Sequence, residues 1–148
     1  MRPRNLIIST ALVGLVMWVV SGLWHNLILA NFYAQAKGAS HEGIGILLIS
    51  YAILAFIMSY LYPLGYQGKA AWLEGLRFGM LMGILWVFPH ELAMAGAHGE
   101  SLTYVFKNGA WHAVEQGIGG MVLGFLYGKM EQSAEEYRWN ASFQGENP

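Results

Sequence analysis

Cysteine and aspartate are absent from this chain of 148 residues, and charged side chains of either sign are few. The lack of cysteine excludes disulfides, thiolate metal sites, iron–sulfur clusters and cysteine nucleophiles. Charged residues make up 11% of the chain and hydrophobic residues 55%. A soluble domain carries about 25% charged residues, so a disordered chain, a coiled coil and an ordinary soluble globule are excluded. With a net charge of −1, we expect no binding to nucleic acid.

Apolar residues gather in four runs, each long enough to cross about 30 Å of hydrocarbon as a helix. The runs cover residues 6–29, 44–62, 76–97 and 109–127, and Pro63 is expected to end the second. We therefore predict an all-α fold, a four-helix transmembrane bundle in contact with the lipid bilayer. In this interpretation residues 1–130 form the single transmembrane domain, and residues 131–148 form a polar cytoplasmic tail.

The first run is longer than the apolar core of a signal peptide, which has about 7–15 residues. We therefore expect a retained first span. Lys and Arg near the ends of the runs indicate the orientation. Six of them lie on the side of the N-terminus, the 63–75 connection and the tail: Arg2, Arg4, Lys69, Arg77, Lys129 and Arg138. Only Lys37 and Lys107 lie on the other side. This bias predicts a multi-pass protein of the cell membrane with both termini in the cytoplasm.

A faint internal repeat relates the two halves of the chain. An offset of 65 residues aligns the first run with the third and the second with the fourth, placing Gly14 on Gly79 and His25 on His90. The first and third runs cross in the same direction, so the halves would be two parallel two-helix repeats. The alignment also predicts that His25 and His90 lie at the same depth in the membrane.

Glycines recur at four-residue spacing in the third and fourth runs. The two series are Gly75, Gly79 and Gly83, and Gly120, Gly124 and Gly128. Small residues at this spacing allow membrane helices to approach closely. We expect these faces to pack the bundle, with association into a homo-oligomer or a larger membrane complex as the alternatives.

Three histidines and two glutamates fall in the outer half of the predicted bundle: His25, His90, His112, Glu91 and Glu115. His90 lies seven residues after Gly83, which predicts that it faces other helices. His112 and Glu115 are three residues apart and share one helix face. This spacing reverses the Glu-x-x-His pairs of carboxylate-bridged di-iron bundles. Because ionisable groups are costly in a bilayer, the cluster suggests function.

Imidazole and carboxylate ligands together suit Zn, Fe or Cu. We therefore predict a metal ion held by His25, His90, His112 and Glu115, with Glu91 as a further ligand or as an acceptor behind the ligands. A haem iron with His25 and His90 as axial ligands is a second alternative, and a proton or ion path is a third. Asn108 is expected to cap the fourth helix, and Glu74 is expected to pair with Arg77.

A structural interpretation of the same cluster stays open beside these. Histidines and glutamates can hydrogen-bond across helices and only hold a bundle together. The protein would then be a small accessory subunit of a larger membrane complex. No phosphate loop, nucleophile elbow or zinc-protease motif is present, so the sequence assigns no catalytic residue and leaves enzymatic activity undecided.

Three short motifs carry a loose resemblance to a known family. They are Gly22-Leu23-Trp24, Glu74-Gly75-Leu76 and the Asn108…Trp111 opening of the fourth run. With the span pattern over residues 10–128, they resemble a family of small bacterial four-span membrane proteins of unknown function. The resemblance implies the topology and does not extend to the three histidines.

Overall fold

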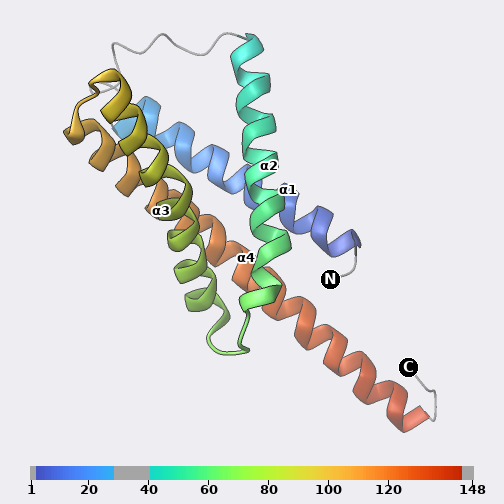
Figure 1. The fold of residues 1–148 in the computed structure, drawn as a ribbon. Helices are drawn as coiled ribbons and strands as arrows, with labels where there is room; N and C mark the ends of the chain where they lie inside the picture. The colour runs from blue at the N-terminus through green and yellow to red at the C-terminus, as the bar shows by residue number, and fades with distance from the viewer. Residues whose placement is uncertain (1–2, 29–40, 145–148) are drawn as a thin grey trace.

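The computed structural model describes residues 3–28 and 41–144, and the side chains of residues 3–27 and 43–142. Helix α1 (Pro3–Leu23) continues into a π-helical segment, η1 (Trp24–Ile28), and is followed by α2 (His41–Gly65), α3 (Ala71–His98) and α4 (Leu102–Gln144) (Figure 1). The all-α prediction is confirmed, since the described residues form helices and short connections only. Residue 29, where the first predicted span ends, lies outside the described ranges.

Three of these helices are long and apolar enough to cross a membrane: Pro3–Leu27, Gly43–Gly65 and Ala71–His98. They correspond to the first three predicted spans. The fourth predicted span lies inside α4, which is not among the three because polar residues such as His112, Glu115 and Gln116 interrupt its apolar sequence. The chain thus has the helices of a membrane protein, and α4 differs from the others in polarity.

Two helix boundaries differ from the predictions. Helix α2 passes through Pro63 and ends at Gly65. Pro63 removes one backbone hydrogen bond, the one from position 63 to the carbonyl of Ser59, and the helix continues for only two residues after it. Helix α4 begins at Leu102 and runs unbroken to Gln144, so the polar tail continues the helix well beyond its neighbours (Figure 1).

The closest packing in the molecule joins α3 to α4, which lie side by side along α3 (Figure 1). A methyl group on Gly75 would overlap the carbonyl oxygen of Gly120, and one on Gly79 would overlap that of Gln116. Similarly, Gly83 lies against the main chain of His112. We call this line of contacts the glycine seam. Both glycine series are buried in this contact between two helices of the same chain, as expected for small residues that pack membrane helices.

Helices α1 and α2 form the other closely packed pair and use the same register. Gly14 faces the carbonyl group of Tyr51 and the side chain of Ala55. The residues 65 positions later in the chain make the equivalent contact, in which Gly79 faces Gln116 and Gly120. The two halves therefore repeat a helix contact as well as a faint sequence pattern.

The two pairs meet over an apolar core. Its fully buried side chains come from α1, α2 and α4: Val13, Met17, Ala55, Met58 and Leu123. Next to them, toward the α2–α3 connection, four aromatic rings pack edge to face or tilted, namely Tyr62, Tyr66, Phe78 and Tyr127.

The connection from α2 to α3 is stabilised by Glu74, which accepts hydrogen bonds from the backbone N–H groups of Gln67 (2.9 Å) and Lys69 (2.8 Å). Both carboxylate oxygens of Glu74 therefore accept hydrogen bonds that close this turn. The expected pair of Glu74 with Arg77 stays a prediction.

Candidate functional site

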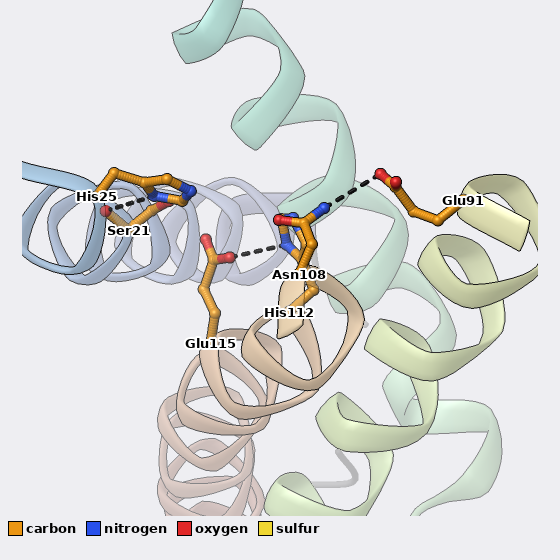
Figure 2. Close-up of polar contacts among 6 residues, drawn as sticks. All are labelled: Ser21, His25, Glu91, Asn108, His112 and Glu115. Carbon is orange, nitrogen blue, oxygen red and sulfur yellow. Dashed lines mark hydrogen bonds and ion pairs between the residues drawn. The ribbon is translucent and has the colours of Figure 1, made fainter. Parts of the chain in front are cut away.

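A carboxylate and an imidazole lie together in the interior at one level of α4. Oε2 of Glu115 is 3.0 Å from Nδ1 of His112, and the Glu115 side chain is 1% exposed against 18% for His112 (Figure 2). The two residues are one helical turn apart, so their side chains share a face of α4. Their contact is an ion-pair contact without the alignment of a hydrogen bond. This pair is the part of the predicted cluster that the structure brings together.

Two further helices contribute hydroxyl groups to the same level. The Tyr51 hydroxyl on α2 lies close to the Glu115 carboxylate and to the Ser21 hydroxyl on α1. Ser21 is buried, and its main-chain carbonyl and hydroxyl oxygens both face His25. Polar groups from α1, α2 and α4 therefore converge around one buried carboxylate. Tyr51 and Ser21 were not among the residues that sequence spacing singled out.

His25 lies in the π-helical segment η1, at the end of α1 (Figure 2). Its Nδ1 is 2.9 Å from the carbonyl oxygen of Ser21 and 3.2 Å from the Ser21 hydroxyl. A carbonyl oxygen can only accept, so Nδ1 carries the hydrogen, and a neutral ring then presents Nε2 as an acceptor. Single π-helical turns are frequent at functional sites. The local structure thus orients His25 through its own helix.

Glu91 contacts α4 through Asn108. The Asn108 side-chain amide donates a 3.1 Å hydrogen bond to Oε1 of Glu91 (Figure 2). Asn108 lies inside α4, which begins at Leu102, so the prediction that it caps the helix is wrong. It joins α3 to α4 at the end of the glycine seam.

His90 is exposed, although its spacing from Gly83 predicted an inward position. The contact face of α3 follows residues four apart, through Gly83, the buried Val87 and the partly buried Glu91. Each four-residue step turns the face by about 40°, because a helix turns about 100° per residue. At the C-terminal part of α3, the side of the helix that contacts α4 therefore includes Glu91 and not His90.

Several buried polar atoms around the pair have no hydrogen-bond partner among the described residues. They include both carboxylate oxygens of Glu115, the amide oxygen and nitrogen of Gln116 and the indole nitrogens of Trp24 and Trp111. The two indole rings stack at 4.0 Å between centroids, and the rings of Trp86 and His112 pack edge to face with their centroids 5.6 Å apart. Buried polar groups are nearly always paired, so this concentration marks the level of Glu115 as unusual.

The predicted metal ligands do not form one group. Within the described residues, no three His or Glu side chains lie close enough together to share a metal ion. His112 is paired with Glu115, Glu91 with Asn108, and His25 with Ser21. The haem alternative needs His25 and His90 on facing sides of one iron, whereas His90 is exposed.

Comparisons with known proteins add no further assignment. No family model, no curated protein and no solved structure matches the chain. The resemblance to small four-span bacterial membrane proteins therefore stays a prediction.

Proposed function

We propose that all four helices cross the bilayer and that both termini lie in the cytoplasm. Helix α4 packs along α3, so it crosses the membrane wherever α3 does (Figure 1). Its outward side chains are apolar, since Phe106, Val114 and Phe125 are 58%, 50% and 51% exposed. Glu115 and Gln116 are fully buried. This distribution suits a span that faces lipid outside and polar groups inside, and the Lys and Arg bias supports the orientation.

We further propose that the bundle takes up and releases a proton at the Glu115–His112 pair. The observation that carries this proposal is a fully buried carboxylate with an imidazole nitrogen 3.0 Å away. A lone charged side chain at the bilayer centre costs about 2.5–3.5 kcal/mol on insertion scales. A proton shared between the two groups removes that net charge.

The chemistry of the pair makes its proton content variable. With one shared proton, the pair is neutral either as carboxylate with imidazolium or as carboxylic acid with imidazole. A second proton leaves a net charge of +1, and loss of the shared proton leaves −1. Each change alters the electrostatic energy in a medium of low dielectric constant. The pair is therefore built to respond to proton concentration, and the Tyr51 hydroxyl beside Glu115 can donate to the carboxylate form.

The structural alternative, with these groups as contacts inside an accessory subunit, explains less of the geometry. Groups that only hold helices together stabilise the fold when their hydrogen bonds are made. In the described part of the chain, neither oxygen of Glu115 is aligned for a hydrogen bond with Nδ1 of His112, 3.0 Å away, and the Tyr51 hydroxyl is the further donor beside the carboxylate. This geometry favours a site that exchanges a proton.

Infrared difference spectroscopy of the protein in lipid vesicles tests the proposal directly. A protonated buried carboxyl group gives a carbonyl stretching band whose intensity follows pH. We expect this band in the wild type, its loss in Glu115→Gln and a changed pH response in His112→Gln. Glu136→Gln is the matched control, because Glu136 is exposed on the same helix, and it should leave the band unchanged.

Two results would overturn the proposal. One is a spectrum that is identical in the wild type and Glu115→Gln at every pH, which leaves the pair as a structural contact. The other is a stoichiometric Zn, Fe or Cu ion in the purified protein that is lost in His112→Ala, which favours the predicted metal site. Circular dichroism confirms that each variant keeps its helices.

A further inference from the structure

The interior above and below Glu115 differs in polarity. Toward the C-terminal part of α4, the next residues inward are Gly119, packed against Met17 and Val13, and then Leu123. We call the five fully buried apolar side chains at these levels the apolar plug: Val13, Met17, Ala55, Met58 and Leu123, each 0% exposed. They come from three helices and fill the space between them.

The apolar plug is thick enough to exclude water. Glu115 and Leu123 are eight residues apart on α4, which corresponds to about 12 Å of helix. The aromatic rings of Tyr62, Tyr66 and Tyr127 lie beyond it. Ser59 is the polar side chain of α2 at this depth, and it is 0% exposed with no partner for its hydroxyl among the described residues. Ser9 of α1 is also 0% exposed, and its hydroxyl bonds to the carbonyl oxygens of Asn5 and Leu6 in its own helix. These isolated hydroxyls form no continuous polar path from Glu115 among the described residues.

Polar groups do continue in the opposite direction. His112 is next to Glu115, and Asn108 lies one helical turn further along the same face of α4. Asn108 is bonded to Glu91 on α3, which is partly exposed. Figure 2 shows Glu115, His112, Asn108 and Glu91 following one another from the interior toward α3. We call these four residues the polar row.

Exposure varies along the polar row: it rises from Glu115 to His112, Asn108 is 7% exposed, and Glu91 at the outer end is partly exposed. The side chain of Glu115 is 1% exposed and that of His112 is 18% exposed. The other groups facing Glu115 are Tyr51 from α2 and Ser21, with His25 behind it, from α1. Helix α3 contributes Trp86 against His112 and Glu91 beyond Asn108, while His90 is exposed outside the row.

We infer that Glu115 exchanges its proton with only one side of the membrane, the side where α3 ends and α4 begins. The polar row provides the route, and the apolar plug closes the other direction. This inference rests on the proposed function, because it names the side from which the Glu115–His112 pair is reached. It assigns Asn108 and Glu91 the role of a polar entrance that lets water approach His112.

Reaction of introduced cysteines measures water access separately from proton binding. The natural chain has no cysteine, so each variant carries a single thiol. Asn108→Cys lies in the polar row, Ser59→Cys lies level with the apolar plug, and Ser101→Cys lies in the exposed connection from α3 to α4. The probe is a charged, membrane-impermeant methanethiosulfonate, added to one side or the other of vesicles that hold the full chain in one orientation.

We expect Asn108→Cys to react from the same side as Ser101→Cys, at least tenfold faster than Ser59→Cys. Ser59→Cys should react from neither side. Labelling of Ser59→Cys at the rate of Asn108→Cys would overturn the inference, as would labelling of Asn108→Cys from the opposite side or no labelling at all. Where Asn108→Cys does not fold, Glu91→Cys carries the same test at the outer end of the row.

A pH jump then tests whether the proton follows this route. In Asn108→Leu, the response of the Glu115 carboxyl band to a jump on the Ser101 side should slow at least tenfold. The control is His90→Leu, which changes an exposed neighbour of Glu91 and should leave the rate unchanged. An unchanged rate in Asn108→Leu overturns the inference, whereas absence of the band from the wild type overturns the proposed function and leaves the cysteine result standing.

Discussion

Tyr66 lies just past the end of α2, beside a carboxylate on the helical tail. Partial burial first, and then the neighbouring Glu131 carboxylate, raise the pKa of the Tyr66 hydroxyl. The folded protein therefore holds this proton more tightly than the unfolded chain. Below the unfolded value of about 10, both states are protonated and the contribution to stability is constant. Above it, only the unfolded chain loses the proton, so stability falls as pH rises.

Replacement of Tyr66 by Phe should reduce this alkaline loss. We expect the free energy of unfolding to fall less steeply above about pH 10 in Tyr66→Phe than in the wild type, because the substituted ring has no proton to hold. Denaturant titrations in detergent followed by circular dichroism measure the slope. Tyr137→Phe is the control, since Tyr137 is 63% exposed. Parallel pH profiles for wild type and Tyr66→Phe would contradict the prediction.

Sequence spacing predicts part of the site because neighbours on one helix have fixed relative positions. The pairing of His112 with Glu115 follows from three-residue spacing. Tyr51 and Ser21 reach Glu115 from α2 and α1. Their approach depends on how those helices are rotated about their axes, which the spacing within either helix does not determine. The partner of Asn108 is likewise set by the register between α3 and α4.

At the scale of the element, the glycine seam determines how α3 and α4 fit together. A side chain on Gly79 would overlap the carbonyl oxygen of Gln116, a main-chain atom that cannot rotate away. We expect Gly79→Ala to lower the free energy of unfolding by about 1–3 kcal/mol, the range for overpacked interiors. The measurement is unfolding of the purified protein in detergent at increasing denaturant.

Gly96→Ala provides a matched substitution on the same helix. An added methyl group at Gly96 meets no atom within 4 Å. Alanine favours helix over glycine by about 0.5–1 kcal/mol, so this variant should be as stable as the wild type or slightly more so. An equal change in the free energy of unfolding in Gly79→Ala and Gly96→Ala would contradict the prediction, because it would show that the close contact at Gly79 has no effect on stability.

The apolar runs predict three of the helices well, because a continuous apolar sequence indicates a span regardless of its partners. The fourth run, 109–127, covers only part of α4 (Leu102–Gln144). The direction in which side chains face was predicted less well. A seven-residue step placed His90 inward, as in helices that cross at a shallow angle. Glycine-mediated membrane pairs cross more steeply, at about 40°, and their contact face follows four-residue steps. Glu91, bonded to Asn108, occupies the inward position that was assigned to His90.

At the scale of the whole molecule, the position of α4 decides the topology. With four spans, the C-terminus and the α2–α3 connection lie on one side, and the α3–α4 connection lies on the other. We therefore expect a reporter at the C-terminus to be accessible from the same side as one inserted after Gly68. A reporter inserted after Gly99 should be accessible only from the opposite side, since Gly99 follows α3.

The alternative arrangement gives a different result with the same three reporters. With only the three apolar helices in the bilayer, the C-terminus would share the side of the Gly99 reporter. That result would contradict the four-span proposal and leave α4 packed outside the membrane. Accessibility of the C-terminal reporter from outside the cell would contradict the cytoplasmic orientation.

The polarity of α4 and the glycine seam together constrain how the protein is made. Glu115 and Gln116 weaken the tendency of α4 to partition into lipid by itself, whereas α3 is apolar enough to do so. Since the seam lets the two helices touch along their backbones, α4 can insert packed against α3, whereas Glu115 is covered by Tyr51 of α2 and Ser21 of α1 once those helices are in place. Biosynthesis would then deliver α3 and α4 to the bilayer as one hairpin, so that damage to the seam changes the number of spans before it changes the stability of a finished bundle.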